Sequence, residues 1–249
     1  MREFSRLVIW VALFLWPSHA FGAAELEFDH LWIVVTRNAP ERVALERAGL
    51  KISPGVNRND GQGTASVSAE FLNSYIELMW PDPSVSVAAS AQRGVEKFKN
   101  RMNWRTSGWC PIGVAVHRTG PGTTLPFPTW TIAPTWMPAG SAIEILTPRE
   151  DTKSPSFFIE PPVLAVKEKA NRELAENDSR RASFQHPIGV ERITGIRIVR
   201  PKGYQSIAAF TIWKRPVLLR QRKGMSGVSM LPLIKGERHR QKICVPTFR

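Results

Sequence analysis

The sequence predicts an α+β protein made of two copies of one strand–helix–strand–strand–strand unit. Overlaying Ile33–Val35 on Val114–Val116 gives a repeat distance of 81 residues, and overlaying Tyr75–Glu77 on Phe158–Glu160 gives 83. The two distances agree within two residues, as a duplication requires. Hydrophobic residues make up 43% of the 249, with 17 Gly and 20 Pro. This composition excludes a coiled coil, a collagen and a wholly disordered chain.

The first unit begins with a strand over 28–35, where β-branched and aromatic residues dominate. A helix follows, with Asn38 as its expected N-cap, Pro40 in its first turn and Gly49 as its stop. The alternation of small and polar residues over 64–71 is typical of an exposed or edge strand. The three strands that complete the unit are expected at 50–52, 64–71 and 75–80.

The second unit follows a connecting helix expected over 85–105, and its own helix is degraded. Its strands are expected at 112–116, 130–132, 142–146 and 157–160. Later segments are a charged helix at 163–181, a strand at 193–199 and an apolar stretch at 207–213. The predicted organisation is therefore a leader at 1–24, a domain at 25–200 with modules at about 26–82 and 109–162, and an extension at 201–249.

The first residues have the pattern of a secretory signal peptide. Arg2 and Arg6 precede a ten-residue apolar run at 7–16, and small residues follow, so that cleavage is expected after Ala20 or Ala24. The run is too short to span a bilayer, which takes roughly 20 apolar residues. We therefore expect a periplasmic or secreted protein with no transmembrane segment after cleavage. The alternative is an uncleaved signal that anchors the protein to the membrane.

Cys110 and Cys244 are the two cysteines of the chain. An oxidising compartment would permit a disulfide between them, although two separate thiols are an equally good interpretation. The absence of a CxxC pair excludes a thioredoxin-like motif and a four-cysteine zinc site.

The net charge of +13 is concentrated at the C-terminus. Residues 214–249 hold ten Lys or Arg and a single acid, Glu237, so that +9 lies there and +4 in the rest. Two interpretations stay open for this basic extension: a disordered tail, or an electrostatic contact with an anionic lipid or polymer. The tail has few aromatic residues for base stacking, and we expect no nucleic-acid partner.

Strand geometry selects the candidate site residues of the first unit. Side chains alternate between the two faces of a strand, so His30 and Trp32 share one face of the first strand. Tyr75, Glu77 and Met79 share one face of the fourth strand in the same way. If both faces turn toward one hollow, an imidazole and a carboxylate project into an aromatic-lined space.

Glu160 would add a second carboxylate from the other unit, beside Phe158. An ionised carboxylate inside an apolar strand costs roughly several kcal/mol unless it is paired or bound to a metal. Glu77 stands between Ile76 and Leu78, and Glu160 follows an apolar run. A functional role or an ion pair, for Glu77 with Arg58 or Arg105, would account for these acids.

At these residues the sequence resembles the vicinal oxygen chelate superfamily, and within it the glyoxalase-like domain proteins. Phe28–Val35 is similar to the opening strand with its metal-binding His, Gly61–Thr64 to the Gly-Thr turn into the third strand, and Tyr75–Leu78 to the fourth strand with its ligand Glu. The later segments that share the likeness are Pro155–Glu160, His186–Pro187 and Gly189–Ile196. The resemblance covers roughly residues 26–200.

The resemblance implies paired βαβββ modules that form a cupped mixed sheet around a divalent ion, as in glyoxalases, bleomycin-resistance proteins and extradiol dioxygenases. It implies His30, Glu77 and Glu160 as metal ligands, with Pro111 at a fourth position where it cannot ligate. The ion would be Zn, Ni, Mn or Fe. Trp32, Tyr75, Met79 and Phe158 would contact a small-molecule substrate, although aromatic and Met side chains in strands are more often plain core. His117 and His186 are expected at the surface.

Two functions follow, and the sequence leaves open whether the protein is an enzyme. The first is a metal-dependent lyase, isomerase or dioxygenase acting on a small substrate with adjacent oxygens, in which the ion polarises those oxygens. The second is a metal-free protein that binds a small molecule in the same hollow. No residue is assigned a catalytic role, and the substrate and oligomeric state stay open.

Overall fold

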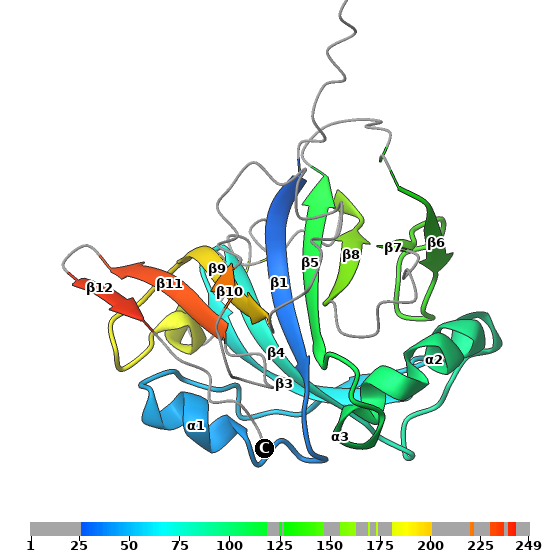
Figure 1. Ribbon diagram of the computed structural model, residues 1–249, viewed down its shortest axis with the longest axis horizontal. Helices are drawn as coiled ribbons and strands as arrows, with labels where there is room; N and C mark the ends of the chain where they lie inside the picture. The colour runs from blue at the N-terminus through cyan, green and yellow to red at the C-terminus, as the bar shows by residue number, and fades with distance from the viewer. Residues whose placement is uncertain are drawn as a thin grey trace, which may run out of the picture.

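A computed structural model describes residues 26–118, 125, 127–146, 155–162, 169, 173, 181–200, 220–221, 230–236 and 239–242. Its main feature is a curled, mixed sheet of eight strands (Figure 1). The strands are β1 Leu26–Val34, β2 Asn57–Asn59, β3 Thr64–Phe71, β4 Ser74–Pro81, β5 Ile112–Arg118, β6 Thr129–Ile132, β7 Ile143–Leu146 and β8 Ser156–Glu160. The helices of the same region are α1 Arg42–Arg47, α2 Ala89–Met102 and α3 Trp104–Ser107. The predicted α+β class with a cupped mixed sheet agrees with this architecture.

The strand order β2-β3-β4-β1-β5-β8-β7-β6 is symmetric about the central pair β1 and β5. In each half the central strand pairs in parallel with the last strand of its half, β1 with β4 and β5 with β8. The remaining strands of each half add outward in antiparallel pairs. The two halves meet where β1 and β5 run antiparallel (Figure 1). The strand order is therefore the same in the two halves, counted outward from β1 and from β5.

The strand register corrects one detail of that comparison. His30 lies opposite Tyr75 in the β1–β4 pair, whereas Ala115 lies opposite Phe158 in the β5–β8 pair. If Tyr75 and Phe158 are equivalent, the counterpart of His30 is Ala115, and Pro111 precedes β5 altogether. The overlay of the first strands used an offset of 81 residues, whereas this equivalence places His30 and Ala115 85 residues apart.

The eight-stranded sheet buries one face in the main hydrophobic core. Alternate residues of β1, β4, β5 and β8 point into this core, with the fully buried side chains Leu31, Ile76, Leu78, Phe157 and Ile159 among the largest. Leu45 of α1 packs against the same face. The residues between them on each strand belong to the opposite face, called the site face below.

Helix α1 is shorter than predicted, and its start is different. Asn38 has φ +64° and does not cap it; the N-cap position belongs to Glu41. The Glu41 carboxylate instead accepts hydrogen bonds from Thr36 N at 2.9 Å and from Arg105 Nη2 at 2.7 Å. Arg105 is thus paired with Glu41 and not with Glu77. Gly49 ends the helix as predicted, at φ +83°.

We expect Glu41→Gln to lower the free energy of unfolding by about 1.5–3 kcal/mol, the range for hydrogen bonds to a charged group. Burial alone would raise the pKa of Glu41, but the hydrogen bonds from Thr36 and Arg105 lower it below its ordinary value. The contribution should therefore be present above the unfolded pKa and vanish as the pH falls through the folded one. Urea denaturation at neutral and acid pH measures both effects. Glu46→Gln, on the exposed side of α1, is the control and should change little.

The strands of the first half differ in two places from the prediction. Residues 50–52 form no strand, because Lys51 N is hydrogen-bonded to the His186 side chain and not to a neighbouring strand. The outer strand is β2, at Asn57–Asn59. Strand β3 is therefore interior, and it is largely buried where an exposed or edge strand was expected.

The predicted connecting helix is confirmed as α2, which joins the two halves. Phe98 of α2 packs edge-on against Trp32 and Phe158, with ring centroids 6.2 and 5.4 Å apart. Arg101 of the same helix is buried and donates to the backbone oxygens of Cys110 and Ile112. Helix α2 therefore lies against the site face and secures the start of β5.

A second sheet has the order β10-β9-β11-β12. Its strands are β9 Ile193–Arg200, β10 Arg220–Gln221, β11 Met230–Gly236 and β12 His239–Lys242. Ile193 and Ile196 of β9 belong to the main core. Strands β10, β11 and β12 fall within the predicted basic extension, so at least these parts of it are β-structure. Four predicted or named features lie outside the described residues: the predicted signal peptide, Cys244, the apolar stretch at 207–213 and most of the helix predicted at 163–181.

Candidate functional site

A buried cluster of imidazole and carboxyl groups lies at one end of the site face, where β1, β4, β5 and β8 run side by side. Its centre is Asp29, whose two carboxylate oxygens contact Nδ1 of His30 at 2.8 Å and Nδ1 of His117 at 3.1 Å. Nε2 of His117 lies 3.7 Å from the Glu27 carboxylate. Asp29 is 1% exposed, and both histidines are buried.

A β-bulge explains how neighbours in sequence come to share one face. The register of β1 against β5 shifts between Phe28 and His30, so that Asp29 has no partner of its own on β5. Regular alternation would have turned Asp29 away from His30. An extra residue in one strand re-aims the side chains around it. Asp29 can therefore reach both His30 and, across the β1–β5 pair, His117.

Glu160 is a second buried acid of this region, besides Asp29. It lies beside His117 in the β5–β8 register and is 6% exposed. Burial raises the pKa of Glu160 to about 7; the positive His30 opposes this, and the negative Asp29 and Glu77 add to it. A carboxyl group with such a pKa can both give and take a proton near neutral pH.

Tyr75 covers the other side of His30. Their rings are stacked, with centroids 4.3 Å apart and planes 10° from parallel. Burial raises the pKa of Tyr75 well above its ordinary value, and the nearby charges of Glu77, Asp29 and Glu160 raise it further. Tyr75 therefore stays a neutral hydroxyl. For His30, burial lowers the pKa, but the hydrogen bond and charge of Asp29 outweigh it and the net shift is upward.

The predicted site residues Trp32, Phe158 and Met79 lie on the same face of the sheet but outside the polar cluster around Asp29. Trp32 lies opposite Glu77 in the β1–β4 register and is 2% exposed. Its ring packs against Phe98 and Phe158, the latter 5.2 Å away between centroids. Met79 lies further along β4 and is partly buried. Trp32 and Phe158 thus belong to an aromatic cluster under α2, next to the polar end of the site face.

The sequence analysis did not select Asp29 as a site residue. It expected His117 and His186 at the surface, whereas both are buried. Regular alternation gave no reason to place Asp29 beside His30, because a bulge has no signature in the alternation of residue types. His117 ends a run of apolar residues in β5, and this run was the available sign that it is interior. The expectation of surface histidines at 117 and 186 is wrong: each is 6% exposed.

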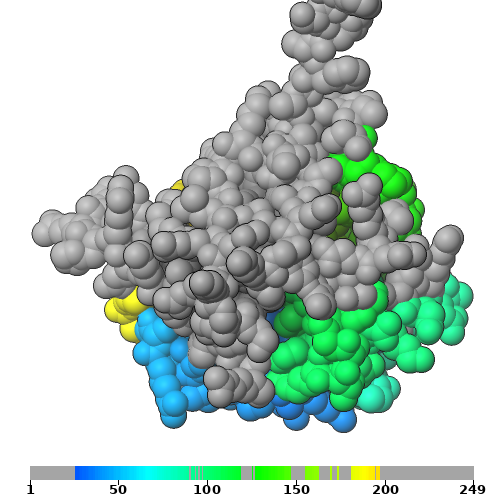
Figure 2. Space-filling model, in the orientation of Figure 1, coloured from blue at the N-terminus to red at the C-terminus, as the bar shows by residue number. Residues whose placement is uncertain are grey.

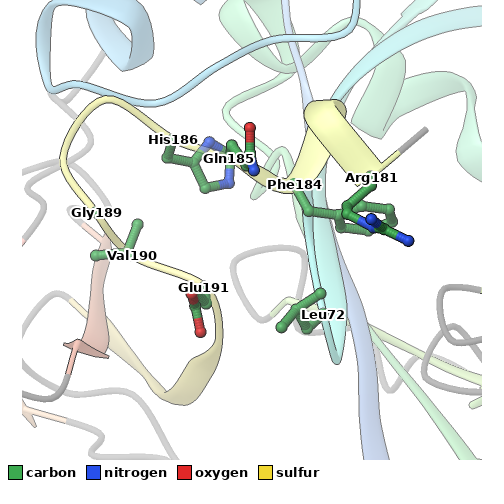
Figure 3. A pocket seen from close by; sticks show the side chains of 8 residues that line it. All are labelled: Leu72, Arg181, Phe184, Gln185, His186, Gly189, Val190 and Glu191. Atoms are coloured by element: carbon green, nitrogen blue, oxygen red, sulfur yellow. The ribbon is translucent and has the colours of Figure 1, made fainter. Parts of the chain in front are cut away.

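A pocket of about 620 Å³ lies elsewhere, between the β3–β4 turn and the segment that precedes β9. Figure 3 shows Arg181 and Phe184 on one side of it and Val190 and Glu191 across from them. His186 in its wall is structural, because Nδ1 accepts from Lys51 N at 2.9 Å and Nε2 donates to the Glu70 carbonyl at 2.8 Å. No predicted site residue lines this pocket; its lining is Leu72, Arg181, Phe184, Gln185, His186, Gly189, Val190 and Glu191.

In Figure 2, α1 and the segment around α2 and α3 form the lower edge of the visible face. Within the described ranges, no three His, Cys, Asp or Glu side chains are arranged to hold a metal ion. Over the same ranges, no helix has the length and apolar character needed to cross a membrane.

Comparisons with known proteins add little. No model of a protein family matches the chain. No curated protein matches it. Similar solved structures include a hypothetical protein from Bacillus halodurans, with 17% identity and a TM-score of 0.33 over 55% of this chain and 94% of that one. Another is a hypothetical protein from Staphylococcus aureus, with 13% identity and a TM-score of 0.39 over 70% of this chain and 69% of that one. Neither likeness carries an argument about function.

Proposed function

We propose that the chain is an exported protein of the glyoxalase-like, vicinal oxygen chelate type that binds a small oxygen-bearing molecule on its site face. The observation that carries the proposal is the convergence of His30, Asp29, His117 and Glu160 from both halves of the sheet. The symmetric strand order supports the family, because paired modules joined through their first strands would give it. The pattern of residues 2–24 supports export.

The metal-dependent form of this function would use His30, Glu77 and Glu160 as ligands. All three lie on the site face, on β1, β4 and β8. As placed, they do not form a ligand set, because no described group of three such side chains is close enough. We therefore assign no step to an ion, and the metal stays a prediction.

The metal-free form is favoured by the state of Glu160. With a pKa of about 7, this carboxyl group is about half protonated at neutral pH and can donate a hydrogen bond to a ligand oxygen. The neutral Tyr75 hydroxyl is a second donor, and a nitrogen of His30 can accept. Such a set recognises a small polar molecule, and Glu160 and His30 could also move a proton on it.

Metal analysis of the full-length protein, purified without chelators, separates the two forms. The metal-dependent form predicts a stoichiometric divalent ion and a rise in Tm on adding Ni, Zn, Mn or Fe, equivalent to about 2.7 kcal/mol when the ion is at 100 times its Kd. Glu77→Gln should abolish the rise, and Glu96→Gln, an exposed acid on α2, should not. If no ion is bound and none raises the Tm, the metal-dependent form is wrong. A thermal-shift screen of small hydroxy and keto acids then tests the metal-free form.

A further inference from the structure

The Asp29 carboxylate determines which nitrogen of His30 carries a proton. A carboxylate can only accept hydrogen bonds. Nδ1 of His30 at 2.8 Å and Nδ1 of His117 at 3.1 Å must therefore both be donors. A neutral imidazole has a single N–H group, so His30 then keeps its lone pair on Nε2.

Two further contacts restrict the orientations that the His30 ring and the Asp29 carboxylate can take. Rotating the His30 ring by half a turn would take Nδ1 away from Asp29 and leave a buried carboxylate oxygen without that donor, which is costly for a group only 1% exposed. The Tyr75 ring, stacked at 4.3 Å and 10°, holds the plane of the imidazole. On the other side, His117 contacts the second oxygen of Asp29 and so keeps that carboxylate in place.

We propose that Asp29 is a positioning residue: anchored by His117, it fixes His30 in the Nδ1–H tautomer and keeps Nε2 as the acceptor or ligand atom of the site. The use of Nε2 rests on the proposed function, whereas the tautomer is a property of the protein alone. Asp29 itself need not touch a ligand. The bulge in β1 is then the structural device that makes the site, since it turns Asp29 toward His30.

The tautomer can be measured directly on the full-length protein without a ligand. Long-range 1H–15N correlation spectra of the imidazoles, recorded above the pH at which His30 titrates, should show Nδ1–H and an unprotonated Nε2 for His30. Assignment uses His30→Gln and His117→Gln. A wild-type His30 with its proton on Nε2 overturns the proposal, and this measurement does not depend on any Asp29 variant folding.

Asp29→Asn supplies the second test. The amide has one acceptor oxygen in place of two, and its NH2 group only donates. At most one histidine can therefore keep donating to residue 29, and at least one ring should move its proton to Nε2. Glu27→Gln is the matched control. Glu27 is an acid near His117, but the proposal gives it no part in fixing the His30 ring, so the His30 tautomer should not change. An Asp29→Asn spectrum in which both rings are unchanged overturns the proposal.

Nickel(II) binding reports whether the position of Nε2 matters for function. Losing a residue that orients a metal-binding His costs typically about 10–100-fold in affinity, and Asp29→Asn should show a loss of that size if His30 ligates the ion. A wild-type protein that does not bind nickel at all contradicts the metal-dependent function and leaves the tautomer intact. An affinity unchanged in Asp29→Asn overturns the positioning role.

Discussion

Raising the pH from 5 to 8 is expected to lower the free energy of unfolding by about 3 kcal/mol, and Glu160→Gln should remove most of this decline. Folding raises the pKa of Glu160 from 4.5 to about 7. Each unit of such a shift corresponds to about 1.4 kcal/mol. The native state therefore retains a proton that the unfolded chain has lost, and stability falls as the pH rises through this interval.

The sign follows from which state binds more protons. The contribution of Glu160 is complete below about pH 4.5 and is lost as the pH passes 7. His30 acts in the same direction, because its folded pKa is also raised, and it should leave a smaller decline above pH 6.5 in the Glu160→Gln variant. His186 acts in the opposite direction within this interval, because its folded pKa is lowered and its contribution to stability grows as the pH rises. The lowered pKa values of Glu41 and Asp82 act at more acid pH, outside the chosen interval.

Guanidinium denaturation at several pH values between 5 and 8 measures the effect. Glu96→Gln removes one exposed carboxyl from α2 and controls for the loss of an acid. A change in stability between pH 5 and 8 that is the same in the wild type and in Glu160→Gln would show that folding does not raise the pKa of Glu160.

Gly113→Ala is expected to destabilise the protein by about 3 kcal/mol, at the upper end of the usual cost of overfilling a core. Gly113 lies opposite Trp32 in the β1–β5 register. A Cβ at this position would overlap the Trp32 indole. The indole cannot retreat easily, because Phe98 and Phe158 pack against it. Glycine is thus required here by a close approach and not by its φ angle.

A double-mutant cycle tests this cause. In a Trp32→Leu background the overlap is relieved, so adding Gly113→Ala should cost only about a few tenths of a kcal/mol more. Gly55→Ala is the control, because a Cβ there has no neighbour within 4 Å. Equal costs of Gly113→Ala in both backgrounds, measured by denaturation, would refute the explanation.

The fold was largely predictable because the strands carry strong local signals. β1, β4, β5 and β8 are runs of β-branched and aromatic residues, and the repetition of two of them indicated a duplicated unit. The errors fell where a tertiary contact decides the outcome. Residues 50–52 do not form the predicted strand, because the backbone N–H of Lys51 donates to His186, 135 residues away. The N-cap position belongs to Glu41 and not to Asn38, and the partner of Glu41 is Arg105, 64 residues away.

The site was predictable only in outline. Strand alternation placed His30, Glu77 and Glu160 on one face, as the register bears out. It could not place Asp29 on this face, because one inserted residue reverses the alternation. It could not predict that His117 is buried, because burial depends on what packs over a strand. The chemistry of the cluster depends on those two residues, so its most informative contacts were those that periodicity could not reveal.

The antiparallel junction of β1 with β5 has a consequence for how such a protein can evolve. One imidazole and its carboxylate partner come from the first half, and the other imidazole comes from the second. Neither half of the sheet, folded alone, would hold the complete cluster. A substitution that weakens the β1–β5 pairing would therefore weaken folding and the chemistry of the cluster together, so that selection acts on both at once.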